Sequence, residues 1–287
     1  MWDRTPPKES GLWQNDGHAS VPRMDEPPVL LALDDRGIAT ATLNRPARGN
    51  AYDGHLLGAL AAGLAELAPR ADLRALVIRG AGKHFQAGAD LDWLARMAEE
   101  ASAEAFAASM ATTRTMQILN EFPRPTLAVV HGACYGGGCG LVCSVDVALA
   151  TPEALFGLTE VRVGVAPTPI SVQMVEAMGL RHTRRYALTG ERFDAAEAMR
   201  IGLVHEVVRA ERLEARLAEI LDAILLAAPS AVALTKRSFL AANDLLIDAP
   251  TTARLAEESW RQRASGEGRE GLSAFREKRK PLWYRPA

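Results

Sequence analysis

A glycine-rich stretch at residues 131–146 (HGACYGGGCGLVCSVD) constrains the fold of this chain more than any other segment. It follows an apolar, strand-like run at residues 126–130 and leads into an apolar segment able to open a helix. Three consecutive glycines, residues 136–138, let the backbone approach a ligand because no Cβ stands in the way. A helix beginning there would present unpaired N–H groups and the positive end of its dipole. The stretch therefore predicts a site for negative charge, either a phosphate or a developing oxyanion.

The surrounding sequence predicts short strands that alternate with helices. Apolar runs predict strands at residues 29–33, 38–43, 74–79, 126–130 and 145–150, the first two joined as a hairpin by the turn-forming residues 34–37. Apolar residues at helical spacing predict helices at 53–67, 102–119, 172–178, 181–188, 195–200, 213–227, 230–246 and 253–263, with Asp53 and Ser102 as N-caps. This order predicts an α/β fold. The helices that follow one another at the end of the chain suggest a lid or an oligomerisation element.

The composition is that of an ordinary soluble enzyme. Of the 287 residues, 48% are hydrophobic and 24% are charged, and the formal net charge is −2. No run of 18 apolar residues occurs, so we expect a cytoplasmic protein with neither a membrane nor a nucleic-acid partner. Residues 1–27 lack periodicity and the apolar core of a signal peptide. We expect a disordered extension there, with Met24 as an alternative natural start.

Other catalytic signatures are incomplete. The cysteines Cys134, Cys139 and Cys143 show no Cys-x-x-Cys spacing, so we expect buried thiols in a reducing compartment and no metal site. Residues 80–83 (GAGK) resemble part of a phosphate-binding loop, but a histidine follows Lys83. Neither a Gly-x-Ser-x-Gly elbow nor a complete dinucleotide fingerprint occurs. An ATPase, a serine hydrolase and an NAD-dependent enzyme are therefore poorly supported.

The order of several motifs resembles that of the crotonase (enoyl-CoA hydratase/isomerase) superfamily. The motifs are residues 43–51 (LNRPARGNA), 85–91 (FQAGADL), 131–146, 156–160 (FGLTE), 188–204 and 265–280. The resemblance implies an α/β spiral of ββα units at residues 28–205, and a helical C-terminal region at 206–287 that packs in a homotrimer or a dimer of trimers. It also implies a coenzyme A thioester as the substrate, with no further cofactor.

The resemblance also implies a set of site residues. In this family two backbone N–H groups hold the oxygen of a thioester enolate, and by motif position they belong to Ala89 and Gly137. Contacts with CoA are implied for Arg45, Ala47, Arg48, Ala87, Asp90, Leu91, Phe275 and Lys278. The basic residues among them are equally consistent with solvated surface charges, and Phe275 with ordinary helix packing.

The carboxylates depart from the family pattern. A standard hydratase of this family uses two glutamates, one on water and one at the substrate α-carbon. The second corresponds to Glu160, but the first, directly after the Gly-Gly-Gly-x run, is replaced by Gly140. Loss of one positioned acid–base group lowers the rate by about 10²–10⁴. Carboxylate counting alone therefore predicts a Δ3-Δ2-enoyl-CoA isomerase, which moves one proton with a single glutamate.

A narrower resemblance favours hydration. Residues 89–93 (ADLDW), 135–141 (YGGGCGL) and 167–171 (PTPIS) are similar to a branch of 3-methylglutaconyl-CoA and isohexenylglutaconyl-CoA hydratases of leucine and terpene catabolism, some of which carry the same glycine. Their substrates have a distal carboxylate, and we hypothesise that this group or an unidentified acid supplies the missing function. The interpretation is a hydratase of a branched or glutaconyl-type 2-enoyl-CoA, with the isomerase second.

Two weaker alternatives come from other classes. Gly140 leaves open a catalytically silent acyl-CoA-binding protein. Some relatives in the superfamily bind RNA. In this chain only the tail near residues 278–280 carries clustered positive charge, and that cluster is too small for binding to RNA phosphates.

Overall fold

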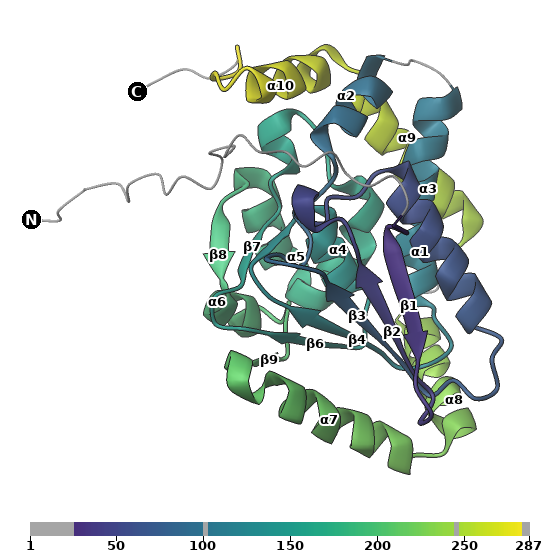
Figure 1. Ribbon diagram of the computed structural model, residues 1–287. Helices are drawn as coiled ribbons and strands as arrows, with labels where there is room; N and C mark the ends of the chain where they lie inside the picture. Colours follow the sequence, from purple (N-terminus) through teal and green to yellow (C-terminus); the bar gives the residue numbers. More distant parts are fainter. Residues whose placement is uncertain (1–25, 100–102, 244–246, 283–287) are drawn as a thin grey trace, which may run out of the picture.

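Two β-sheets form the framework of this protein (Figure 1). The computed structural model describes residues 26–99, 103–243 and 247–282, so the predicted extension at residues 1–27 lies almost wholly outside the described residues. The larger sheet contains, in spatial order, β1 (Val29–Leu33), β2 (Ile38–Leu43), β3 (Ala75–Gly80), β4 (Thr126–Val130), β6 (Val147–Ala150) and β9 (Glu206–Val207). β1 and β2 form the predicted antiparallel hairpin, and all other neighbours are parallel.

The smaller sheet consists of β5 (Ala133–Tyr135), β7 (Leu155–Gly157) and β8 (Arg192–Asp194), in that order. The helices are α1 (Gly54–Leu67), α2 (Leu91–Glu99), α3 (Ala103–Asn120), α4 (Gly137–Cys143), α5 (Ser171–Thr189), α6 (Ala195–Arg200), α7 (Ala210–Leu226), α8 (Pro229–Ala242), α9 (Ala249–Arg263) and α10 (Gly266–Arg276). Three 3₁₀ turns complete the list: η1 (Pro46–Arg48), η2 (Glu160–Val163) and η3 (Thr168–Ile170).

Helices cover both faces of the larger sheet because its parallel strands are apolar on both sides. Successive residues of a strand face opposite ways, so Val77 of β3 packs towards α7 while Ile78 packs with α1 and α3. On α7 the buried stripe has a spacing of four residues, as expected for one helix face: Leu213, Leu217 and Leu221. Figure 1 shows α7 running beneath the sheet and α1 and α3 along its other side.

The C-terminal helices are buried to different degrees, and α8 is the least buried of them. α9 packs on α3, and α10 packs on α2 and η2. α8 has no buried residue among those described and exposes Leu234 and Phe239, while Lys236 ties it to the sheet through an ion pair of 2.8 Å with Asp146. Within the described ranges no single helix is long and apolar enough to cross a membrane; α7 and α8 meet that criterion only as a pair bent by 102°.

The mixed α/β class and the helical C-terminal region are confirmed, and most predicted elements lie within two or three residues of the observed ones. The two helices predicted at 172–178 and 181–188 form one element, α5, interrupted at Gly179, whose φ of 71° and ψ of 150° are not helical. The cap predicted at Ser102 lies outside the described residues. The prediction missed α2, β9, α10 as a separate helix, and the smaller sheet. The strands of the smaller sheet have three residues each and are too short to show a period of two.

Candidate active site

The glycine-rich stretch folds into β5, a sharp turn at Gly136 and the helix α4. Gly136 has φ 52° and ψ −119°, a conformation that side chains oppose, and its N–H donates to the carbonyl of Gly157 over 2.8 Å. The N–H of Gly137, the first residue of α4, has no acceptor in the part of the chain that the structure describes. An N–H at this position is one of those that a helix leaves unpaired, so Gly137 offers a donor to a ligand.

Each glycine of residues 136–138 lies against a different side chain. A Cβ on the first would stand 3.0 Å from Oε1 of Glu160, and a Cβ on the second 2.4 Å from Cε1 of Tyr52. A Cβ on the third would stand 2.7 Å from Oε1 of Gln86. The glycine run therefore does more than open the backbone to a ligand, since it lets three polar side chains close around the turn.

A second loop presents the other predicted donor, the N–H of Ala89. The side chain of Gln86 accepts from the N–H of Gly88 over 2.8 Å and donates to its carbonyl over 3.1 Å, which fixes the loop. On either side of Ala89, Tyr52 N–H donates to the Gly88 carbonyl over 3.0 Å and Asp90 N–H donates to the Tyr52 carbonyl over 2.7 Å. The N–H of Ala89 itself has no acceptor among residues 26–99, 103–243 and 247–282.

The two free N–H groups belong to adjacent, parallel segments. Gln86 pairs with Cys134 in a parallel bridge, and the N–H of Tyr135 donates to the Gln86 carbonyl over 2.9 Å. Ala89 and Gly137 each lie three residues beyond this pair, so the register brings them to the same end of the two loops. A thioester oxygen held there would meet two backbone donors, which is the arrangement of an oxyanion hole.

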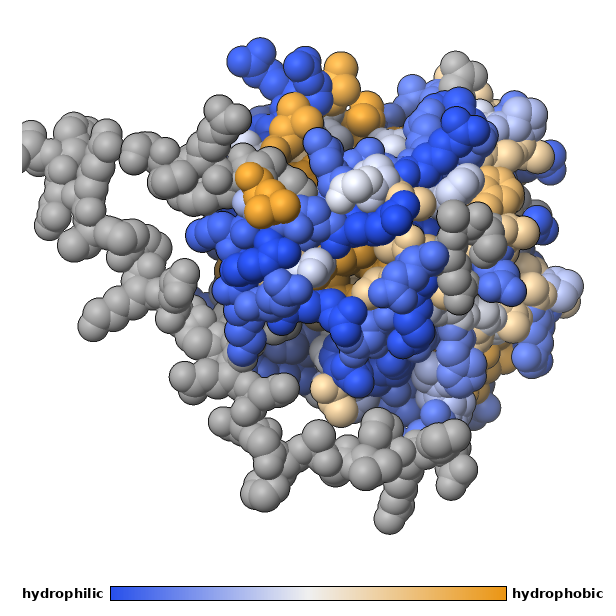
Figure 2. All heavy atoms as spheres, turned by 90° about the horizontal axis from the view of Figure 1, so that it is seen from above, coloured by the Kyte–Doolittle hydropathy of each residue, from blue (hydrophilic) through white to orange (hydrophobic). Residues whose placement is uncertain are grey.

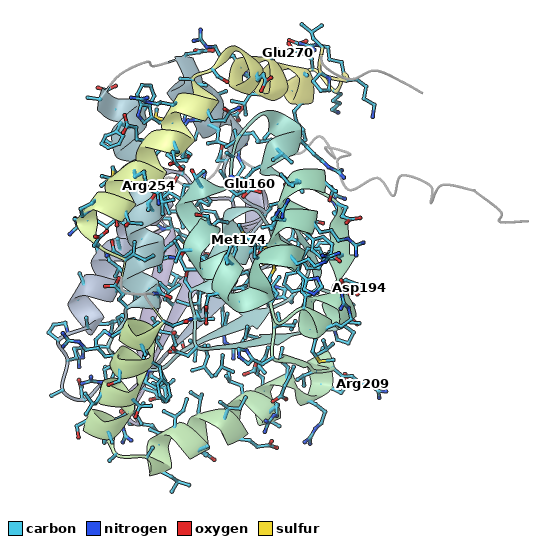
Figure 3. The ribbon with its side chains drawn as sticks, turned by 180° about the vertical axis from the view of Figure 1, so that it is seen from behind. Glu160, Met174, Asp194, Arg209, Arg254 and Glu270 are labelled. Atoms are coloured by element: carbon cyan, nitrogen blue, oxygen red, sulfur yellow. The ribbon has the colours of Figure 1, made fainter. Side chains whose placement is uncertain are left out.

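Glu160, at the start of η2, brings a carboxyl group to this turn. Its Oε2 is shielded from solvent and has no hydrogen-bond partner in the described residues, and its Oε1 lies beside Gly136. Burial raises the pKa of Glu160 from 4.5 to about 7, because desolvation penalises the charged form. Such a group can both take and give a proton near neutral pH. Figure 3 shows Glu160 near the middle of the molecule, below the C-terminal helix that carries Glu270 and above Met174 of α5.

Tyr52 is a site residue that the sequence did not single out. Its ring covers Gly137 and meets the indole of Trp93 edge-on, with the ring centroids 5.9 Å apart. Burial and, to a lesser extent, the nearby charge of Glu160 raise the pKa of Tyr52 well above its ordinary value, so the Tyr52 hydroxyl stays protonated. Its hydroxyl lies beside that of Thr112 on α3. An aromatic residue in a motif loop carries no signal that tells it from a core residue.

Gly140, where a second glutamate was expected, lies against Ile170. A Cβ at Gly140 would stand only 2.4 Å from Cγ2 of Ile170 and 3.1 Å from its Cβ, and Ile170 is 2% exposed. An aliphatic side chain therefore fills the space beside this position. The backbone of Gly140 is also hydrogen-bonded, because its carbonyl accepts from the Ser144 hydroxyl over 2.8 Å.

The model of the enoyl-CoA hydratase/isomerase family matches residues 34–286. The chain belongs to this family. It is 34% identical to an enoyl-CoA hydratase from Mycobacterium avium whose crystal structure superimposes with a TM-score of 0.80, over 90% of this chain and 100% of that one. It is 30% identical to the short-chain-enoyl-CoA hydratase of Clostridium acetobutylicum, over 88% of this chain and 95% of that protein. It is 31% identical to the mevalonyl-coenzyme A hydratase of Aspergillus fumigatus, over 88% and 94% respectively.

Membership of the family confirms the predicted crotonase superfamily and makes an acyl-CoA substrate the natural expectation for the site. Two of the predicted CoA contacts, Arg45 and Asp90, are paired with each other. Arg45 Nη2 lies 3.2 Å from Oδ2 of Asp90, and Arg45 Nη1 lies 3.1 Å from Oδ2 of Asp53. Asp90 also accepts from the N–H of Trp93 over 3.2 Å at the start of α2. These contacts give both residues a role in holding the loop of Ala89, beside the contact with CoA that stays a prediction.

The other predicted CoA contacts lie on the surface or only partly within it: Ala47, Arg48, Ala87, Leu91, Phe275 and Lys278. Arg48 is loosely paired, with its Nη1 3.4 Å from Oδ2 of Asp92, and both side chains are more than half exposed. Figure 2 looks down on the end of the molecule formed by α10, where mainly hydrophilic side chains face outward and hydrophobic residues show between them. The contacts of these six residues with CoA remain predictions.

Proposed function

We propose that this protein adds water to a 2-enoyl-CoA with a branched or glutaconyl-type acyl chain. The observation that carries the proposal is the position of Glu160, whose desolvated carboxyl lies against the turn that leads to the Gly137 N–H. Forming and quenching a thioester enolate needs one acid–base group near neutral pKa beside an oxyanion site. Relatives named short-chain-enoyl-CoA hydratase and mevalonyl-coenzyme A hydratase support hydration and a range of acyl chains.

In the proposed reaction one carboxyl group serves twice. Ionised Glu160 takes a proton from water as the water oxygen bonds to C3, and the C2–C3 electrons move through C1 to the thioester oxygen. The N–H groups of Ala89 and Gly137 hold the resulting enolate, and one such donor contributes about 10²–10³ in rate. Protonated Glu160 then gives its proton to C2 as the carbonyl reforms. The net change is the addition of one water, and Glu160 returns to its starting state.

An enoyl-CoA isomerase is the second candidate, and the contact between Gly140 and Ile170 favours it. The apolar side chain beside Gly140 leaves that side of the site without a carboxylate to bind water. Proton transfer from C2 to C4 by Glu160 alone needs no such water. The same Glu160 and the same two N–H groups serve either reaction.

A substrate panel in deuterated water separates the candidates. We expect 3-methylglutaconyl-CoA to be hydrated with deuterium incorporated at C2, and 3-hexenoyl-CoA not to be isomerised. Migration of the 3-hexenoyl double bond without hydration of any substrate would contradict the proposal and support the isomerase. Binding of all the thioesters without turnover would identify the protein as a silent acyl-CoA binder.

We also propose a homotrimer or a dimer of trimers, assembled through the C-terminal helices. α8 supports this assembly because it exposes Leu234 and Phe239, which are 66% and 71% accessible in the single chain. Light scattering behind size-exclusion chromatography should give three or six times the chain mass. A monomer at micromolar concentration would contradict it.

A further inference from the structure

Arg263, the last residue of α9, is a buried cation near the candidate site. The residue is 3% exposed, and its Nη2 donates to the Ala105 carbonyl and to the Ser109 hydroxyl, both over 3.0 Å. Its Nε is shielded from solvent and has no partner in the described residues. Nη1 also makes no hydrogen bond there, and unlike Nε it is not wholly shielded. The guanidinium therefore keeps donors free.

A buried guanidinium is costly unless an anion compensates it, because removing the charge from water is penalised by several kcal/mol. No carboxylate forms an ion pair with Arg263 within residues 26–99, 103–243 and 247–282. The other arginines of α9 behave differently. Arg254 pairs with Glu258 over 2.9 Å and Arg261 pairs with Glu257, and both arginine side chains are more than half exposed. The buried arginine is thus the one that lacks a carboxylate.

A short chain of contacts links Arg263 to the oxyanion turn. The Tyr52 ring lies on Gly137, and the Tyr52 hydroxyl lies beside Thr112. The charge of Arg263 is close enough to lower the pKa of this hydroxyl, against the larger effect of burial. Thr112 and Ser109 lie three residues apart on α3, so they share a face with about 5–6 Å between their Cβ atoms. Arg263 therefore lies about one helical turn beyond the Tyr52 hydroxyl.

We infer that Arg263 binds a carboxylate at the far end of the acyl chain, with the Ser109 hydroxyl holding the guanidinium in place. The substrate class is then the CoA monothioester of an unsaturated dicarboxylic acid. This assignment rests on the proposed function, which brings the acyl chain into the site. A planar guanidinium suits a carboxylate because two N–H groups can meet its two oxygens. Arg263 is a binding residue here and takes no part in proton transfer.

Binding of saturated thioesters tests the inference without requiring turnover. Glutaryl-CoA and valeryl-CoA match in chain length and differ in the terminal carboxylate, and calorimetry gives a Kd for each. We expect glutaryl-CoA to bind the wild-type protein at least tenfold more tightly. Arg263→Met should raise the Kd of glutaryl-CoA by at least about 30-fold, as truncation of one partner of a buried charge pair does. The Kd of valeryl-CoA should change less than threefold.

Arg261→Met is the matched control, because Arg261 lies on the same helix with an exposed side chain, and it should change neither Kd. Arg263→Lys should retain part of the preference, and Ser109→Ala should lower it severalfold, which keeps the test open if Arg263→Met does not fold. An equal loss of affinity for both ligands in these variants, or no preference of the wild type for glutaryl-CoA, would overturn the inference. Selective binding of glutaryl-CoA by a protein that hydrates nothing would overturn the proposed function and uphold the role of Arg263.

Discussion

Introducing glutamate at Gly140 tests whether Ile170 occupies the place of a second carboxylate. The Cβ of the new residue would stand 2.4 Å from Cγ2 of Ile170, and real Cβ atoms essentially never approach within 3.0 Å. Gly140→Glu should therefore lower the free energy of unfolding by about 1–3 kcal/mol, the usual effect of overpacking. For a domain of this size each kcal/mol lowers Tm by about 2–4 °C. The expected fall in Tm is thus roughly 2–12 °C.

Ile170→Ala makes the prediction quantitative through a double-mutant cycle. Alone it should lower stability by about 2–5 kcal/mol, because Ile170 is almost fully buried. In Gly140→Glu/Ile170→Ala the new side chain gains the vacated space. We therefore expect the free energy of unfolding of the double variant to exceed the value predicted by adding the two single effects by at least about 1 kcal/mol. Thermal and urea unfolding measure this coupling, and hydration of crotonyl-CoA, if it rises only in the double variant, shows that the added carboxylate is functional. Additive changes, or Gly140→Glu as stable as wild type, would refute the packing argument.

Three further predictions follow from the site and its surroundings. Because Glu160 must be ionised to take a proton from water, kcat/KM should rise with pH through about 7. Because folding raises the pKa of Glu160, the free energy of unfolding should fall as pH rises from about 4.5 to 7. A flat rate profile across this range would argue against Glu160 as the base. Gly137→Ala should abolish turnover and lower Tm, since its Cβ would stand 2.4 Å from the Tyr52 ring, and wild-type activity in this variant would be incompatible with the proposed oxyanion turn. Lys236→Met should lower the free energy of unfolding by about 2 kcal/mol in urea titrations, because it leaves Asp146 without its 2.8 Å partner; an unchanged midpoint would show that this ion pair contributes nothing.

The sequence indicated the features of the site whose chemistry is local. The glycine run after β5 predicted a turn and a helix start, and the motif around Glu160 predicted its acid–base role. The sequence also places Gly140 where the family pattern has a carboxylate. The occupant of the neighbouring space was not predicted, because the contact with Ile170 is tertiary and appears only when η3 and α5 pack on α4.

Arg263 and Tyr52 show why other site residues could not be found from sequence. α9 carries several arginines, and nothing in their spacing tells the buried Arg263 from the exposed Arg254 and Arg261. The distinction arises from the packing of α9 on α3, which buries one helix face only. The loop motif that contains Arg45 predicted a contact with CoA, whereas the structure adds its ion pairs with Asp53 and Asp90. Side-chain pairing within a loop depends on its backbone conformation, which motif matching does not supply.

In the proposed reaction Glu160 alone moves the proton between water and the substrate α-carbon. Replacing it with glutamine preserves its shape and removes its ability to accept a proton, so the decisive measurement is kcat of Glu160→Gln on the substrate that the wild type prefers. A fall of about 10²–10⁴ is predicted, with the Kd of a saturated acyl-CoA unchanged, since the proposed role of Glu160 is at the reacting atoms and not in binding CoA. Turnover at the wild-type rate would contradict this role of Glu160 and would assign the acid–base role to another group.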